Sequence, residues 1–229
     1  MDRSSAPGRV LETPRGPIAL VDWADPDPLA RLRLDDGLGA FGHYSRHAAE
    51  IQGKALARVA GLPEGRVLVA VQEDRIVGFL TFHPADREIR WGRDPFPELL
   101  ELGGIEVGRG HRNLGIASAL MALAFDGGAY EDRIVYATGY TWCWDLEGSG
   151  LSKGGYRGKI LALFKRFGFD EHVTDEPNVR FDWCNVLMVR VGPGVPLAAY
   201  RRFLDLLFEK PAGLNPDGAP AGPRAAGVK

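Results

Sequence analysis

The chain has 229 residues, of which 45% are hydrophobic and 25% charged, and its net charge is −2. This length suits one domain with a substantial core, and the near-neutral charge argues against nucleic-acid binding by bulk electrostatics. No stretch is long and apolar enough to cross a membrane, and the amino end lacks the apolar run of a signal peptide. The cysteines, Cys143 and Cys184, follow no metal-binding spacing. We therefore expect a cytoplasmic protein with reduced thiols.

The first part of the chain predicts one strand and two helices after a polar start. Residues 1–16 carry two prolines and little apolar content, so we expect a flexible arm there. The apolar segment at residues 17–23 predicts a strand, and residues 29–34 predict a short helix. A longer helix is expected over residues 43–62, where apolar side chains recur at helical spacing.

The clearest local signal of the sequence is a β-hairpin at residues 66–83. Two apolar runs flank the polar turn at residues 72–75, as in a hairpin with a short loop. Residues 99–107 predict the next strand, and the pair Gly103 and Gly104 suggests a β-bulge within it.

The second half of the chain alternates helices and strands. Helices are predicted at residues 113–125, 156–169 and 196–210, and strands at residues 133–140 and 185–192. This order predicts an α/β (α+β) fold with a mixed, mostly antiparallel sheet.

We expect one domain over residues 17–209, because no linker divides the chain. Residues 210–229 are rich in proline, glycine and alanine and predict a disordered tail. The amphipathic helix before this tail suits either a dimer surface or closure of the domain, so both a monomer and a homodimer remain open.

Three cationic or potentially cationic residues occupy the turn between the strand at 99–107 and the next helix: Arg109, His111 and Arg112. The start of a helix is already positive, so such residues oppose the helix dipole and favour a bound anion instead. The first N–H groups of the helix have no internal partner. Small residues at Gly115 and Ala117 would let a pyrophosphate approach the backbone. The turn therefore predicts an anion cradle.

Two other phosphate motifs fit this turn less well. Gly108 and Gly110 begin the pattern G-x-G-x-x-G of dinucleotide-binding folds, but Asn113 stands where its third glycine belongs. The Gly-Lys-Ser/Thr ending of a P-loop is absent.

The pattern Arg112-x-x-Gly115-x-Ala117, preceded by a strand ending at Val107, resembles the coenzyme A motif of GNAT N-acetyltransferases. The segment "LALFKRFGF" at residues 161–169 is similar to a later helix of that family. The resemblance implies a sheet with splayed central strands and acetyl-CoA as the cofactor. It also implies a set of residues that bind coenzyme A, namely Ile105, Val107, Arg109, His111, Arg112, Asn113, Leu114, Gly115, Ile116, Ala117, Ser118 and Tyr156.

A narrower resemblance covers residues 100–192. The segments "YTWCWDLEGSGLSKGGYRGKI", "TDEPN" and "NVLMVRVG" are similar to the acetoin-utilisation branch of the GNAT family. This branch is associated with lysine acetylation of acetyl-CoA synthetase, so it implies a protein lysine as acceptor. Two alternatives stay open: an N-acetyltransferase for a small amine or amino-acid metabolite, and a catalytically silent acyl-CoA-binding regulatory module. Asn185 belongs to the branch pattern without an assigned role.

Acetyl transfer to a lysine requires a neutral amine. With a pKa of ~10.4, neutralising a free lysine at pH 7 costs about 4–5 kcal/mol, so a general base or a desolvating pocket is needed. By resemblance to the histone-acetyltransferase branch of the family, Glu101 is the first candidate base. Glu106 is the second, because it lies on the opposite pleat from Val107 unless a bulge shifts it.

The general acid that many GNAT enzymes use is missing from its usual place. Phe164 stands where those enzymes carry a tyrosine that reprotonates the thiolate. Tyr156, about two turns earlier, is the candidate substitute. Stacking on the cofactor and simple packing are the alternatives for this side chain.

Trp142, Trp144 and Asp145 form a W-x-W-D run after the strand at 133–140. Aromatic walls with a carboxylate suit the stem and head of a lysine, so we expect these residues to bind the acceptor. Core packing is the alternative for at least one tryptophan. His43 and His47 lie one helical turn apart, but without a glutamate or third ligand in H-E-x-x-H fashion we expect no metal site.

Overall fold

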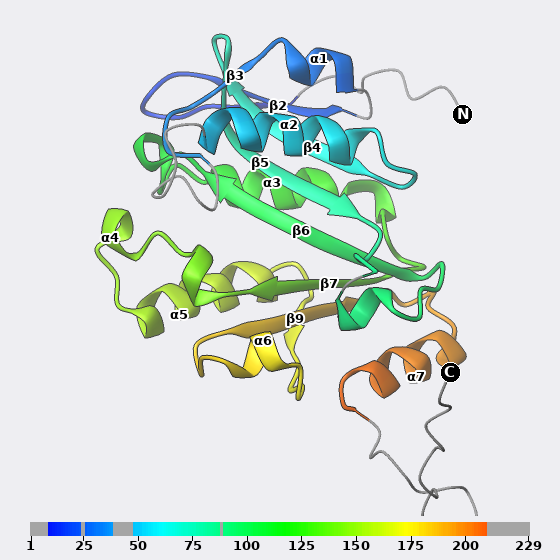
Figure 1. Ribbon diagram of the computed structural model, residues 1–229. Helices are drawn as coiled ribbons and strands as arrows, with labels where there is room; N and C mark the ends of the chain where they lie inside the picture. Colours follow the sequence, from blue (N-terminus) through cyan, green and yellow to red (C-terminus); the bar gives the residue numbers. More distant parts are fainter. Residues whose placement is uncertain (1–8, 24–25, 39–47, 88, 210–229) are drawn as a thin grey trace, which may run out of the picture.

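The computed structural model describes residues 9–23, 26–38, 48–87 and 89–209 (Figure 1). The strands are β1 (Arg9–Leu11), β2 (Ile18–Trp23), β3 (Arg33–Leu34), β4 (Arg66–Gln72), β5 (Arg75–His83), β6 (Leu99–Val107), β7 (Ile134–Gly139), β8 (Asp170–Glu171) and β9 (Val186–Val191). The helices are α1 (Pro26–Ala30), α2 (Ala48–Ala60), α3 (Ile116–Ala124), α4 (Leu146–Ser149), α5 (Lys153–Lys165), α6 (Pro177–Arg180) and α7 (Leu197–Leu206). Four short 3-10 turns are η1 (Arg90–Gly92), η2 (Arg109–His111), η3 (Asp126–Gly128) and η4 (Thr141–Cys143).

The strands of the described residues form one sheet in the order β1-β2-β4-β5-β6-β7-β9-β8, with β3 beside β5. The pairs β3 with β5 and β6 with β7 are parallel, and the other pairs are antiparallel. The predicted α/β fold with a mixed, mostly antiparallel sheet is thus confirmed. The hairpin predicted at residues 66–83 is the pair β4 and β5.

Alternate residues of the central strands pack on opposite faces of the sheet, as the period of two requires. On one face, α3 and α5 cover a core that includes Leu100, Leu120 and Phe164. On the other face, α2 covers β4 and β5, while η1 and α7 cover β7 and β9. Among the described residues, no helix has the length and apolar character that crossing a membrane requires.

The two central strands separate along their length. Strands β6 and β7 pair only from Leu99 to Glu101 on one side and from Ile134 to Tyr136 on the other. Figure 1 shows that they diverge beyond this point, toward their carboxyl ends, with α4 near the open end. Each strand keeps its outer partner, β5 for β6 and β9 for β7, so the sheet is split rather than unfolded. The splayed strands implied by the family resemblance are therefore present.

A β-bulge lies in β6 at the predicted place. Thr81 pairs with Gly104 and Phe82 with Leu102, so Gly103 is the extra residue. Its missing side chain makes room for His83, because a Cβ atom on Gly103 would lie 2.1 Å from the Nε2 atom of that histidine. The bulge shifts the alternation of side chains along the second half of β6.

Two predictions for the start of the chain need correction. Arg9–Leu11 forms strand β1 on β2, so this part of the expected arm at residues 1–16 is ordered by sheet pairing. The short helix is not at residues 29–34: α1 begins at Pro26, and Arg33–Leu34 pairs with β5 instead. Proline favours the first turn of a helix, which explains the earlier start. Residues 1–8 and 210–229, and the start of the helix predicted from residue 43, lie outside the described residues.

The boundaries of two predicted helices also move. Helix α3 starts at Ile116 rather than at residue 113, because Asn113 (φ 62°) and Gly115 (φ 82°) have left-handed backbones that an α-helix does not continue. Helix α5 starts earlier than predicted, at Lys153, where the Ser152 side chain accepts a hydrogen bond from the backbone N–H of Gly155.

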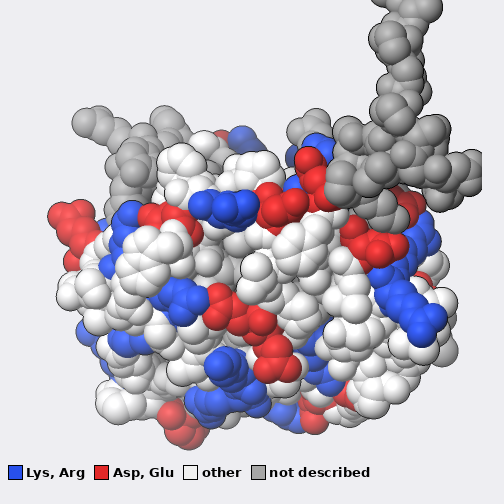
Figure 2. All heavy atoms as spheres, turned by 90° about the horizontal axis from the view of Figure 1, so that it is seen from below, with Lys and Arg blue, Asp and Glu red and all other residues white. Residues whose placement is uncertain are grey.

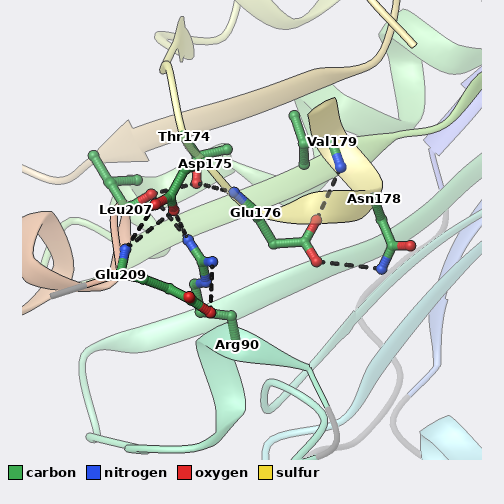
Figure 3. A network of polar contacts seen from close by, with 8 residues as sticks. All are labelled: Arg90, Thr174, Asp175, Glu176, Asn178, Val179, Leu207 and Glu209. Carbon is green, nitrogen blue, oxygen red and sulfur yellow. Dashed lines mark hydrogen bonds and ion pairs between the residues drawn. The ribbon is translucent and has the colours of Figure 1, made fainter. Parts of the chain in front are cut away.

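A polar network fastens the carboxyl end of α7 to the rest of the domain (Figure 3). The buried Arg90 of η1 donates to Asp175 and to the carbonyl of Leu207. Asp175 also accepts from the backbone N–H of Glu209, at 2.9 and 3.1 Å. The side chain of Thr174 donates to the same Leu207 carbonyl. The network shows that α7 closes the face of the sheet formed by β7 and β9.

Candidate active site

A groove of about 410 Å³ lies between the amino end of α3 and helix α5. Its lining residues include the cations Arg112, Lys159 and Arg166, and among the described residues no Asp or Glu. The Arg166 guanidinium donates to the Ser118 hydroxyl at 3.2 Å, which links the two helices across the groove. An anionic ligand therefore meets positive charge and hydrogen-bond donors on both walls.

The backbone of the turn explains why the groove opens here. Gly115 caps α3 with φ at 82°, and a Cβ atom on it would meet nothing within 4 Å. The first N–H groups of an α-helix have no partner inside the helix, and they carry the positive end of its dipole. Ile116, Ala117 and Ser118, the first three residues of α3, line the groove. The predicted anion cradle is consistent with this geometry.

Most of the residues predicted to bind coenzyme A line this groove. They are Val107, His111, Arg112, Asn113, Gly115, Ile116, Ala117, Ser118 and Tyr156. Ile105, Arg109 and Leu114 do not line it; Ile105 and Leu114 pack against the core of the α3 face. The sequence reasoning missed the opposite wall. That wall contains Ser149, Leu151, Lys159, Ala162, Leu163 and Arg166.

The spacing of the missed residues of α5 relative to Tyr156, which was predicted, contains a signal. Tyr156, Lys159, Leu163 and Arg166 follow one another at intervals of three or four residues, which places them on one face of α5. Reading that face as the partner of the turn would have found the second wall of the groove.

The two arginines of the turn share one carboxylate. Arg109 donates to Asp145 from Nε at 2.7 Å and from Nη2 at 2.8 Å, and Arg112 Nη1 lies 2.8 Å from the same carboxylate. Asp145 also accepts from the backbone N–H of Gly148 at 2.9 Å and so caps α4. Burial alone would raise the pKa of Asp145, but the hydrogen bonds from Arg109, Gly148 and Arg112 hold it well below its usual range.

This arrangement argues against the predicted contact of Asp145 with the head of the acceptor lysine. Both carboxylate oxygens already accept hydrogen bonds within the protein, and the residue is 9% exposed. The W-x-W-D pattern did not reveal this contact, because Asp145 and Arg109 lie 36 positions apart in the sequence.

His111 is held beneath the turn. The side chain is buried, and its Nε2 atom lies 2.9 Å from Oε1 of Gln72 in the β4–β5 hairpin. Its Nδ1 atom lies 3.5 Å from Asp35. Although His111 reaches the lining of the groove, its contact with Gln72 anchors the turn to the hairpin.

Tyr156 lines the groove and stacks on Trp144, with ring centroids 5.1 Å apart and an angle of 14° between the planes. Burial raises the pKa of Tyr156, while the nearby Arg112 acts to lower it. The phenol is therefore protonated at neutral pH. Phe164, at the position of the family tyrosine, is buried and packs edge-on against Phe169, so this position faces the core.

Glu101 lies where the paired part of β6 and β7 ends. It pairs with Tyr136, whose hydroxyl donates to Oε2 of Glu101 at 2.6 Å. Burial raises the pKa of the Glu101 carboxyl, although the Tyr136 hydrogen bond and the nearby His83 act to lower it. Leu100 and Leu102 pack on the α3 face, so the alternation of the strand places Glu101 on the opposite face.

The bulge at Gly103 brings the second candidate base to the same face as the first. Glu106 pairs with Phe79, whose side chain packs on the face that α2 covers, whereas Val107 packs on the face that α3 covers. Glu106 and Val107 therefore lie on opposite faces of the strand, as predicted. Cys143 lies beyond the end of β7. Burial raises the pKa of its thiol, and the negative charge of Glu106 raises it further.

Trp142, which is 40% exposed, belongs to a group that we call the exposed aromatic cluster. It consists of Tyr140, Trp142 and Phe181, which are in ring contact, and Trp183, which follows Phe181 by two residues; Tyr140 itself is partly buried. Tyr140 and Trp142 stack at 4.5 Å, and Phe181 contacts Trp142 edge-on at 5.8 Å. Phe181 and Trp183 are each 79% exposed. Trp142 therefore does not pack in the core.

Asn185 fixes the loop that carries this cluster. Its side-chain oxygen accepts from the backbone N–H of Thr141, and its amide donates to the carbonyl of Asn178, both at 2.7 Å. These bonds give a structural role to a residue that the sequence left without one. Within the described residues, no cluster of histidine, cysteine, aspartate or glutamate suits a metal ion. His43 and His47 lie outside those residues.

Known proteins of similar sequence and structure fall in one family. The model of the acetyltransferase (GNAT) family matches residues 23–137. Acetoin utilization protein AcuA of Bacillus licheniformis is 32% identical over 198 residues, which are 86% of this chain and 92% of that protein, and the same figures hold for AcuA of Bacillus subtilis. The crystal structure of an acetoin utilization protein from Exiguobacterium sibiricum is 33% identical and covers 91% of this chain and 96% of that chain, with a TM-score of 0.84.

Proposed function

The chain belongs to the GNAT acetyltransferase family, and we propose that it transfers the acetyl group of acetyl-CoA to the ε-amino group of a protein lysine. The observation that carries the proposal is the position of Glu101. This carboxylate lies at the point where β6 and β7 begin to diverge, on the face of the sheet opposite to the groove between α3 and α5. A donor in the groove and an acceptor on the other face would meet in the gap between these strands.

The positive charge of the groove supports coenzyme A as its ligand. The N–H groups of Ile116, Ala117 and Ser118 and the side chain of Arg112 would hold the pyrophosphate. Lys159 and Arg166 supply further positive charge on the opposite wall. When bound, acetyl-CoA supplies the activated thioester.

The residues of the chain supply the proton transfers. Glu101, in its ionised form, takes one proton of the lysine ammonium. The neutral nitrogen would then form the new C–N bond as the C–S bond breaks, and the second proton that it loses would balance the one given to the leaving sulfur. Tyr136 holds Glu101 in place and stabilises its charged form. The phenol of Tyr156 is a protonated donor at the groove, suited to give a proton to the leaving sulfur.

The exposed aromatic cluster favours a protein acceptor over a small amine. A small amine that reaches Glu101 would leave Phe181 and Trp183 uncovered, whereas tryptophan and other aromatic side chains are frequent anchors of protein interfaces. The face seen in Figure 2 mixes Lys and Arg with Asp and Glu, so it offers no extended basic surface of the kind that nucleic acids require. Acetyl-CoA synthetase, the target associated with the acetoin-utilisation branch, is the candidate acceptor.

The test is incubation of the purified protein with labelled acetyl-CoA and either acetyl-CoA synthetase or a panel of small amines. Label on lysines of the synthetase supports the proposal. Label only on small amines supports the metabolite enzyme instead. Tight binding of coenzyme A with no transfer to any acceptor supports a silent regulatory module.

A further inference from the structure

Beyond the ends of the splayed strands, a buried carboxylate joins the two sides of the gap again. Arg109 follows the end of β6, and Asp145 follows the end of β7. Their side chains meet in a two-point hydrogen bond of 2.7 and 2.8 Å. The gap is therefore bounded by the Tyr136–Glu101 contact at its narrow end and by the Arg109–Asp145 contact beyond its wide end.

The same carboxylate controls the orientation of the groove arginine. Arg112 Nη1 lies 2.8 Å from Asp145, and Arg112 Nε donates to the carbonyl of Val107 at 3.3 Å. An ion pair and one long hydrogen bond thus restrain a guanidinium that lines the groove. A fixed guanidinium binds a phosphate with less loss of side-chain entropy than a mobile one.

We propose that Asp145 is a positioning residue for the cofactor: it holds Arg112 toward the groove and, through Arg109, ties the end of β6 to the loop after β7. This inference rests on the proposed binding of coenzyme A in the groove. The opposite role would be competition with the ligand, in which the Asp145 carboxylate neutralises the arginines and weakens anion binding. The positioning role also differs from direct contact with the acceptor amine.

Coenzyme A titrations of the wild type and of Asp145→Asn distinguish these roles, because the substitution removes the charge and keeps the shape. Positioning predicts a dissociation constant about tenfold higher in the variant. It also predicts a matching rise in KM for acetyl-CoA and an unchanged KM for the acceptor. Tighter binding of coenzyme A would show competition and overturn the inference. Unchanged coenzyme A binding with a raised acceptor KM would show acceptor contact and overturn it as well.

Two further variants serve as control and second test. Asp94 makes a similar two-point contact with Arg202, and both residues are exposed and lie outside the groove lining. Asp94→Asn should therefore leave coenzyme A binding unchanged. Arg109→Lys keeps the positive charge but loses the planar fork. It therefore tests the inference even if Asp145→Asn does not fold, and it should weaken coenzyme A binding severalfold. Unchanged or tighter binding in Arg109→Lys would contradict the positioning role.

The failure of this inference is distinguishable from failure of the proposed function. A wild-type protein that does not bind coenzyme A refutes the function itself. A wild type that binds coenzyme A, with Asp145→Asn and Arg109→Lys binding equally well, refutes only the role of Asp145.

Discussion

The hydroxyl of Tyr136 donates a hydrogen bond to the Glu101 carboxylate at 2.6 Å. Tyr136 and Glu101 are paired with each other, and they are the last paired positions of β7 and β6. Beyond this contact the strands separate, so the carboxylate lies at the narrow end of the gap. The position of Glu101 is set by the sheet itself rather than by a loop. Rigid placement of this kind is what a general base requires.

Glu101→Gln should abolish most of the acetyl transfer while leaving the cofactor bound. The amide keeps the shape of the side chain but cannot take a proton, so we expect kcat to fall by ~100-fold or more. The dissociation constant of coenzyme A, measured by calorimetry, should stay within a factor of about two, because Glu101 does not line the groove. Full activity of this variant at neutral pH would remove Glu101 from the mechanism, and Glu106→Gln would then be the next variant to measure.

Tyr136→Phe should shift the pH dependence of the rate. Burial raises the pKa of Glu101, and the Tyr136 hydrogen bond counteracts part of this rise. The ionised base works only above its pKa, so activity is lost as the pH falls through that value. Removing the hydroxyl raises the pKa further and moves the acidic limb of kcat/KM to higher pH. An acidic limb that stays in place, or moves to lower pH, would show that Glu101 does not determine it.

Removal of two cations from the α5 wall should weaken binding of acetyl-CoA. In the double variant Lys159→Ala with Arg166→Ala, we expect KM for acetyl-CoA to rise about tenfold at low salt and by less at high salt, because screening already weakens these contacts. The control is Lys165→Ala, an exposed cation on the same helix outside the groove lining. An equal effect of the control would mean that only overall charge matters.

The general-acid role of Tyr156 and the position of Phe164 can be tested as a pair. Tyr156→Phe removes the hydroxyl at the groove and should lower kcat by ~100-fold if the thiolate needs a proton donor. Phe164→Tyr restores the family residue in a buried, apolar site, where burial of the new hydroxyl costs free energy. We expect no gain in kcat and a loss of about 1–3 kcal/mol in the free energy of unfolding. Higher activity in Phe164→Tyr would show that this position does reach the reacting atoms.

The exposed aromatic cluster should matter for a protein acceptor alone. In Phe181→Ser with Trp183→Ser, we expect kcat/KM for acetyl-CoA synthetase to fall about tenfold, while transfer to a short lysine peptide stays unchanged. Val173→Ser, an equally exposed apolar residue outside the cluster, is the matched control. Equal losses on the protein and on the peptide would argue against docking through this cluster.

The sequence was most informative where one short segment contains the whole signal. The turn from Val107 to Ala117 predicted an anion cradle from local chemistry, and seven of its eleven residues line the groove. The hairpin and the bulge at Gly103 were likewise found where alternation and glycine placement indicated them. Such features depend on neighbours in sequence, so pattern and propensity suffice to predict them.

Contacts between segments that are distant in the sequence could not be predicted from the sequence pattern. The sequence pattern predicted that Asp145 binds a lysine, whereas in the fold its carboxylate contacts Arg109 and Arg112. Helices α4 and α6 have four residues each, too few for a periodic pattern, and they depend on the caps from Asp145 and Glu176. Strand β3, with two residues, exists only through pairing with β5. In each case tertiary contact, not local preference, determines the structure.

The most direct test of the account is a crystal structure of the protein with coenzyme A. We predict that the pyrophosphate lies on the N–H groups of Ile116 to Ser118 beside Arg112, and that the sulfur enters the gap between β6 and β7 on the way to Glu101. A cofactor bound away from the α3–α5 groove, or a sulfur that points away from this gap, would contradict the account.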